Sequence, residues 1–584
     1  MHLFGLSLLA ILTGVVAGFG AVAFRGLIAF VHNLLFLGRF SLTYESNLHT
    51  PPSPWGPFVI LVPVVGAACV AFLVKNFAPE AKGHGVPEVM DAIYYNRGII
   101  RPVVAVIKSL ASAVSIGSGG SVGREGPIVQ IGATFGSTLG QLLRIPTWQR
   151  VTLIASGAGA GIAATFNTPV GGVLFAVELM LHEVSARTIV PVVLSTATAT
   201  FIGRAFFGDH PAFSIPQQQI IYFHLTNLWA LLTYVGLGLL LGLASVAFIK
   251  SIYGAEDFFE KRIGGSYYRQ HLLGMLVVGV VIYVLMISFG HYFVQGVGYA
   301  TIQDLFSGIR YPLYLMVLLF ASKLLATSLT LGSGASGGIF SPSLFMGATL
   351  GAAYGTLIHW LFPGVAINIP AFAVAGMAGV VGGATGAAMT AIVMLFEMTL
   401  DYNAILPAAI TVAVSYGLRK SLLRDSIYTL KLVRRGHYMP QALQTDLHFL
   451  RPARDIMDTS FAAFPASDLI RDTGPKLLSQ QDASVFLVVE DGGMVGFVTH
   501  EMLLEATCGR PGEKTLGQIA VGHYVTVSDQ TSLLDVLAKM RMTGAFIALV
   551  LPEGAESTAG SIEGVVTKQG IADSLADVTE LFTG

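Results

Sequence analysis

Apolar runs broken by glycine and proline fill residues 1–432 of this 584-residue chain. The runs cover 5–36, 57–77, 102–118, 147–181, 188–206, 225–250, 270–294, 312–331, 343–361, 370–398 and 404–418. Several are long enough to cross roughly 30 Å of hydrocarbon as helices, and others are short and broken. The pattern predicts an all-α polytopic membrane protein that contains broken helices.

From about residue 436 the pattern changes to that of a soluble α/β region. Residues 485–506 read as strand, Asp-Gly-Gly turn, strand and helix, and residues 546–577 repeat this order with a longer loop. Basic residues gather just before the change, at Arg419, Lys420, Arg424, Lys431, Arg434 and Arg435. Because basic residues favour the cytoplasmic side, the α/β tail is expected in the cytoplasm.

One glycine-rich segment occurs twice within the apolar sequence. Residues 108–136 align without a gap to residues 323–351, and 13 of the 29 aligned positions are identical. Glycine and proline at corresponding places in two halves of a membrane protein indicate broken helices that meet at a site near the bilayer midplane. The repeat therefore predicts that the protein moves something across a bilayer.

Composition supports a membrane location and argues against nucleic acid as a partner. Hydrophobic residues make up 53% of the chain and charged residues only 11%, against about 25% in soluble domains. The formal net charge is −1, so no nucleic acid is expected, and an anion would be attracted by local dipoles or single residues. The two cysteines lie in different contexts and form no disulfide framework. The lipid bilayer is the expected environment, in a plasma or inner membrane.

The repeated segments carry the chemistry of an anion site. Glycines let backbone amides approach a ligand, and a helix that starts after such a turn presents unpaired N–H groups and the positive end of its dipole. Residues 338–342 contain no ionisable side chain, so a ligand there would be held mainly by backbone. A pair of tight membrane turns without a ligand is the alternative.

Glu125 lies in the first copy, where the second copy has Phe340. A carboxylate in an apolar stretch is costly and indicates function. Beside an anion site, it would compete for that site when charged and vacate it when protonated. A structural pair between Glu125 and Arg124 at a membrane interface is the alternative.

Three ordered motifs make residues 5–432 resemble the CLC family of anion channels and anion/proton antiporters: GHGVPE at 83–88, GREGP at 123–127 and GGIFSP at 337–342. The resemblance implies an inverted repeat of tilted, broken helices, with halves at about 1–206 and 225–432. It also implies a homodimer with one pore per subunit and chloride as the bound ion.

The resemblance also implies site residues. The amides of Ile339 and Phe340 would hold the central anion, Glu125 would be the external gate and proton relay, and Arg124 and Gly126 of the same motif would belong to the anion site. Tyr428 would supply an inner hydroxyl, although a lone tyrosine is more often an interfacial anchor.

The inner motif departs from the family pattern GSGIPE, because His84 stands in place of serine. The imidazole could donate an N–H to the anion and, if protonated, add positive charge. Alternatively, His84 turns into a packed loop and the amides of Gly85 or Val86 line the path.

A second departure concerns proton coupling. Proton-coupled members usually carry two adjacent glutamates, but Glu178 is followed here by Leu179, which cannot relay a proton. The sequence favours uncoupled, channel-like flux gated by Glu125; an anion/proton antiporter with another internal proton route is the alternative. Glu178 and the corresponding Glu397 are expected to be structural.

The tail resembles a tandem of CBS domains, with a linker at 433–450 and domains at 451–510 and 511–584. Members that bind adenine nucleotides usually carry an acidic residue three positions after the threonine of the second strand, where this chain has Met502 and Gly570. Adenine nucleotide binding and a ligand-free packing and dimerisation module both remain open.

Other functional classes fit the sequence less well. The chain lacks the zinc-binding triad of an intramembrane metalloprotease, so no metal is expected, and an adenine nucleotide in the tail is the one candidate cofactor besides the bound chloride. A divalent-cation transporter would need converging carboxylates, and a sensory membrane protein would leave the repeats unexplained. Transport of chloride or a similar monovalent anion, with no enzymatic activity, is the leading hypothesis.

Overall fold

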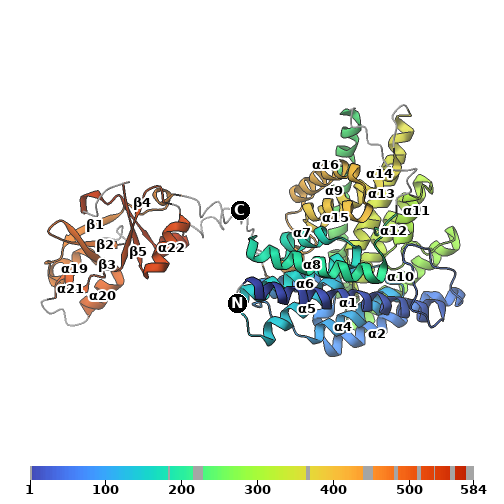
Figure 1. The fold of residues 1–584 in the computed structure, drawn as a ribbon, viewed down its shortest axis with the longest axis horizontal. Coiled ribbons are helices and arrows are strands. Elements are labelled where there is room, and N and C mark those ends of the chain that lie inside the picture. Colours follow the sequence, from blue (N-terminus) through green and yellow to red (C-terminus); the bar gives the residue numbers. More distant parts are fainter. Residues whose placement is uncertain are drawn as a thin grey trace. The chain divides into compact units, whose positions relative to one another are not determined.

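A computed structural model describes residues 3–181, 184–214, 228–363, 368–437, 452–478, 485–508, 514–531, 533–552 and 559–573. The chain divides into two compact units, Met1–Met439 and Pro440–Gly584. Most of the expected linker, 438–450, lies outside the described residues. The first unit is helical and the second contains two small sheets (Figure 1).

The first half of the helical unit contains α1 (Leu3–Leu37), α2 (Val62–Phe77), α3 (Val86–Tyr94), α4 (Val103–Gly117), α5 (Glu125–Leu142), α6 (Thr147–Phe166), α7 (Pro169–Leu179) and α8 (Ala186–Phe207). The second half contains α9 (Leu228–Phe258), α10 (Tyr267–Phe289), α11 (Tyr299–Phe306), α12 (Leu313–Gly332), α13 (Phe340–Leu361), α14 (Ile369–Thr385), α15 (Ala388–Thr399), α16 (Ile405–Leu422) and α17 (Thr429–Val433). Among the described residues, seven helical stretches are long and apolar enough to cross a membrane. The prediction of a multi-pass helical membrane protein is confirmed.

The two halves use the same packing scheme, shifted by eight helices. Helix α1 packs on α6 and α8, as α9 packs on α14 and α16, and α5 packs on α6 as α13 packs on α14. Figure 1 shows α1, α5 and α6 side by side in the first half. The repeat seen in the sequence is therefore a repeat of the whole half.

Two of the apolar runs contain a pair of helices each. In the run 147–181, Asn167 takes a left-handed conformation (φ 60°) after α6, and Pro169 opens α7. In the run 370–398, Gly386 (φ 82°) separates α14 from α15. A left-handed residue ends a helix without interrupting hydrophobicity, so periodicity alone does not reveal the break.

The repeated glycine-rich segments form equivalent breaks. Helix α4 ends at Gly117 and α5 starts at Glu125, while α12 ends at Gly332 and α13 starts at Phe340. Gly119 (φ 106°) and Gly334 (φ 116°) take conformations that favour glycine. After each break a new helix starts at a buried residue, Glu125 in α5 and Phe340 in α13.

The tail contains two copies of one three-stranded unit. The sheets are β1 (Phe461–Pro465), β2 (Val485–Glu490) and β3 (Gly493–Thr499), and β4 (Tyr524–Ser528), β5 (Ile547–Leu551) and β6 (Gly564–Thr567). In each sheet the first strand is parallel to the second and the second antiparallel to the third. Helices α19 (Ile470–Leu478), α20 (His500–Cys508), α21 (Leu516–Ile519) and α22 (Leu533–Thr543) accompany the sheets. The predicted duplicated α/β tail is present.

Candidate anion site

The three sequence motifs meet through main-chain hydrogen bonds. Gly337 donates to the oxygen of Gly83 at 3.2 Å, which joins the third motif to the first. Gly123 and Gly338 donate to each other at 2.7 and 2.6 Å, which joins the second motif to the third. The loops therefore converge although they lie far apart in the sequence.

Glycine is required where these loops touch. A Cβ atom on Gly126 would lie 2.0 Å from the carbonyl oxygen of His84, and Gly85 has φ 88° with the oxygen of Gly126 close by. Such approaches exclude a side chain. The gate segment and the inner motif are thus in direct backbone contact.

The start of α13 presents unpaired amides. The amides of Ile339 and Phe340 donate to no acceptor among the described residues, while Ser341 N–H points at a carboxylate of the other half. The first amides of a helix carry the positive end of its dipole. The side chains of Ile339 and Phe340 are buried, so the backbone supplies the only polar groups of these two residues.

The Glu125 carboxylate occupies this helix start. Glu125 is 1% exposed, and its Oε1 accepts hydrogen bonds from Tyr299 Oη at 2.6 Å and from Ser341 Oγ at 2.5 Å. Its Oε2 accepts from Ser341 N–H at 3.3 Å. A negatively charged group held by a helix N-terminus and two hydroxyls takes the position that a small anion would take.

Sequence reasoning missed Tyr299 and Ser341. Ser341 directly follows the two amides singled out from the motif and has no charge to mark it. Tyr299 opens α11 after the segment Gly296-Val297-Gly298, which is the counterpart of Gly83-His84-Gly85 before α3. Comparison of these two glycine-spaced triplets would have found Tyr299.

Two buried lysines support the loops before α3 and α11. Lys108 and Lys323 begin the two copies of the repeat, and both are 0% exposed. Each Nζ donates to two carbonyl oxygens of one loop: Lys108 to Ala81 (3.0 Å) and Gly83 (2.8 Å), and Lys323 to Val294 (3.0 Å) and Gly296 (2.7 Å). These bonds fix the backbone of the loop before α3 and of the loop before α11.

His84 and the neighbour of Tyr428 in sequence, Ile427, both contact Tyr253. His84 is 5% exposed, and its buried Nδ1 has no partner among the described residues. Its ring lies edge-on to Tyr253, with 6.3 Å between centroids. Tyr253 Oη donates to the oxygen of Ile427 at 2.5 Å, beside the buried Tyr428. An unpaired imidazole nitrogen is free to meet a ligand.

Two further predicted site residues, Val86 and Arg124, lie at the starts of α3 and α5. Val86 is the buried first residue of α3, and Arg124 is the residue before α5. The Arg124 guanidinium lies 5.4 Å from the centroid of the Tyr299 ring, and its buried Nε has no partner among the described residues. Arg124 therefore places positive charge next to the tyrosine that binds Glu125.

Glu178 and Glu397 cap each other's helices. Glu178, near the end of α7, accepts from the amides of Met389 (2.9 Å) and Thr390 (2.7 Å) at the start of α15. Glu397, near the end of α15, accepts from the first amides of α7, those of Val170 (3.1 Å) and Gly171 (2.7 Å). Both carboxylates thus have helix-capping roles, and Leu179 beside Glu178 is a buried apolar residue.

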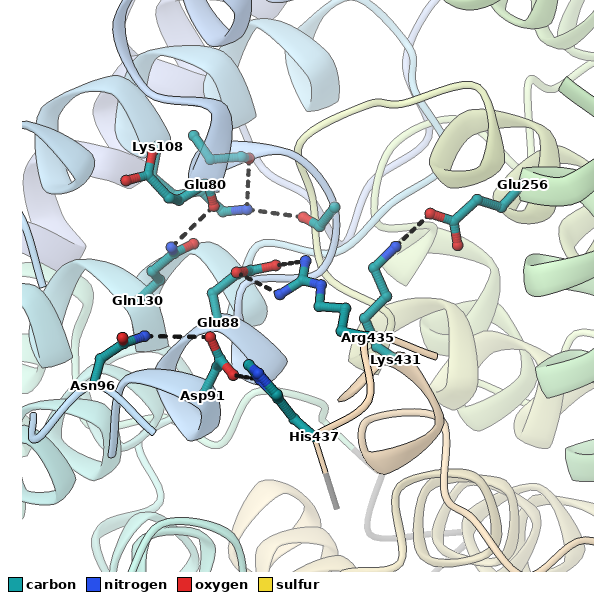
Figure 2. A network of polar contacts seen from close by, with 12 residues as sticks. Glu80, Glu88, Asp91, Asn96, Lys108, Gln130, Glu256, Lys431, Arg435 and His437 are labelled. Atoms are coloured by element: carbon teal, nitrogen blue, oxygen red, sulfur yellow. Dashed lines mark hydrogen bonds and ion pairs between the residues drawn. The ribbon is translucent and has the colours of Figure 1, made fainter. Parts of the chain in front are cut away.

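The segment after Tyr428 is tied to helices of both halves (Figure 2). Arg435 donates to the carboxylate of Glu88 in α3 from both of its terminal guanidinium nitrogens, and these hydrogen bonds raise the pKa of Arg435. His437 contacts Asp91 of α3 at 2.5 Å, and Lys431 pairs with Glu256 of α9. Ion pairs therefore hold residues 431–437, which precede the tail, against α3, the helix that begins within the inner motif.

Comparisons with known proteins find one family over most of the helical unit. The family model described as voltage gated chloride channel matches residues 66–420. The chain is 31% identical over 407 residues to the H(+)/Cl(-) exchange transporter ClcA of Yersinia pseudotuberculosis, covering 69% of this chain and 82% of that protein. Its structure is similar to that of a slow cyanobacterial Cl-/H+ antiporter (TM-score 0.62, 25% identity), covering 74% of this chain and 97% of that one. A eukaryotic CLC transporter matches in fold over 97% of both chains (TM-score 0.59, 21% identity).

Proposed function

The chain belongs to the voltage-gated chloride channel family, and from this premise we propose that it carries chloride or a similar monovalent anion through a pathway gated by Glu125. The observation that carries the proposal is the Glu125 carboxylate at the start of α13, hydrogen-bonded to Tyr299 and Ser341. A carboxylate in that position blocks an anion by occupying its donors. When the carboxylate leaves or is neutralised, the amides of Ile339 and Phe340 and the Ser341 hydroxyl become available to the anion.

Glu125 is the group whose protonation opens the path in this proposal. A charged carboxylate gains most from the helix N-terminus and the two hydroxyl donors, and a neutral one gains less. Acid therefore releases the side chain and increases anion flux. Arg124, the backbone of Gly126, and the inner groups of His84, Gly85, Val86 and Tyr428 line the rest of the proposed path.

Uncoupled flux is the first form of the proposal. Leu179 is buried beside Glu178, and Glu178 is engaged by the amides of α15, so neither supports an internal proton route at this place. Anion/proton exchange by another internal route is the second candidate, because similar proteins are described as an H(+)/Cl(-) exchange transporter and a Cl-/H+ antiporter.

One experiment separates these candidates and tests the gate. Purified protein in liposomes is followed with a chloride electrode and a proton electrode. Uncoupled flux predicts chloride movement without uphill proton movement; proton pumping driven by a chloride gradient would establish exchange instead. Glu125→Gln should retain chloride flux and lose its dependence on pH. Unchanged pH dependence in this variant would overturn the assignment of the gate.

We further propose that the protein acts as a homodimer with one pathway per subunit and that its tail lies in the cytoplasm. The basic residues around the end of α16 and α17 support this orientation. In the tail, Thr499 and Thr567 use their hydroxyls to accept from the amides of Met502 (3.4 Å) and Gly570 (2.9 Å). Because neither turn has an acidic residue at the third position after its threonine, where Met502 and Gly570 stand, the favoured role of the tail is packing rather than nucleotide binding.

A further inference from the structure

Arg25 is the single charged side chain of α1, a helix of 35 residues. A lone guanidinium in an apolar helix is costly unless a partner or function compensates it. The ring of Phe207 lies 4.3 Å from the guanidinium carbon, but Arg25 forms no salt bridge among the described residues. Arg25 was not singled out from the sequence, although its isolation in the run 5–36 is visible there.

A second arginine lines the same cavity. Arg25 and Arg124 line one small cavity, part of it open to solvent, together with Tyr44 and Ser46. The buried Nε of Arg124 has no partner, and Arg124 likewise forms no salt bridge within the described part of the chain. Two arginines thus line one cavity, and among the described residues no carboxylate is paired with either.

The surrounding groups favour an anion over other ligands. Guanidiniums present several fixed N–H donors and no acceptor, and the hydroxyls of Tyr44 and Ser46 can add donors. Glu45 lies near enough for its charge to act on Arg25, but its side chain is exposed and makes no ion pair with it. A small monovalent anion in the cavity would supply the negative charge that the two arginines lack.

We propose that Arg25 and Arg124 hold a small monovalent anion in this cavity, as a binding site separate from the one that Glu125 occupies. The proposal rests on anion transport as the function. Arg124 connects the two sites, because it precedes Glu125 and its guanidinium faces the Tyr299 ring whose hydroxyl binds the carboxylate. An anion held there is adjacent to the gate and ready to enter when the carboxylate moves.

Bromide soaks of crystals of the full-length protein test the site directly, because bromide scatters anomalously and replaces chloride. We expect an anomalous peak between Arg25 and Arg124 in the parent protein. In Arg25→Gln the bromide concentration for half occupancy should rise about tenfold, the loss expected when one charge-assisted contact is removed. Arg39→Gln, which removes the same charge from an exposed residue in the loop after α1, should leave the occupancy unchanged.

The outcomes distinguish this inference from the proposed function. A cavity empty of bromide in the parent protein overturns the inference, even when Arg25→Gln does not fold. Equal half-occupancy concentrations in the parent, Arg25→Gln and Arg39→Gln overturn it as well. Chloride flux is measured on the parent protein in liposomes: flux with an empty cavity removes only the second site, whereas absence of anion flux removes the proposed function itself.

Discussion

Tyr299→Phe tests whether the tyrosine hydroxyl holds the gate closed. The substitution removes one of three donors to the Glu125 carboxylate and leaves the ring, which packs against Phe213 and the Arg124 guanidinium. A hydrogen bond to a charged group contributes about 1.5 kcal/mol at the lower end of the usual range, which is roughly a tenfold change in population. The displaced, conducting position of Glu125 should therefore be populated about tenfold more in the variant when the carboxylate is charged.

The assay is chloride efflux from liposomes over a series of pH values. Flux through Tyr299→Phe should exceed parental flux at neutral pH and converge with it in acid, where the carboxylate is neutral in both proteins. In a Glu125→Gln background the same tyrosine substitution should have little effect, because the charged acceptor is gone. A double-mutant cycle of these two positions measures the coupling.

A matched control separates gating from loss of stability. Tyr292 Oη accepts a hydrogen bond from the amide of Ser53 at 2.9 Å in a buried place away from the carboxylate. Tyr292→Phe removes a comparable buried hydrogen bond and should not alter the pH profile. If Tyr299→Phe is folded and its flux matches the parent at every pH, the hydroxyl does not hold the gate.

Four other substitutions test the site and its support. His84→Ser should change the ratio of nitrate to chloride flux or its pH response by several-fold, because the unpaired Nδ1 would no longer face the path; identical selectivity would place the ring outside the path. Lys108→Met and Lys323→Met should each lower the free energy of unfolding by about 2 to 4 kcal/mol, because two buried carbonyls lose their donor. Similar losses in detergent-based unfolding would support the equivalence of the two lysines, and a loss confined to one would contradict it. Glu397→Gln should cost about 1 kcal/mol of stability as a weakened helix cap, measured in the same way, without changing the flux, and a changed flux would show a role beyond capping.

The sequence predicted the parts of the structure that leave a pattern along the chain. Hydrophobic runs gave the helical membrane unit, and strand, turn and helix order gave the duplicated tail. The duplicated glycine-rich segment pointed to Glu125, and the family resemblance pointed to Ile339 and Phe340; the structure brings all three to one helix start. The break between α6 and α7 at Asn167 does not change the hydrophobicity of the run 147–181, so the hydrophobic pattern alone did not reveal it.

The rest of the site depends on contacts between distant segments. Tyr299 lies 174 residues from Glu125, and a tyrosine in an apolar segment carries no sign of its partner. The reciprocal contacts of Glu178 and Glu397 are of the same kind, since each carboxylate meets amides from the other half. Residue type and spacing identify a carboxylate that needs a partner, but only the packing of the halves identifies the partner.

The exchange of caps between α7 and α15 has a consequence for biosynthesis. Glu178 leaves the ribosome 212 residues before Thr390, so its donors do not yet exist when the first half enters the bilayer. Because the chain is synthesised from the N-terminus onward, the first amides of α7 and the carboxylate of Glu178 have no partner until the second half has been translated. A nascent chain that stops after α8 would leave these groups of α7 unpaired, and membrane quality control could recognise them.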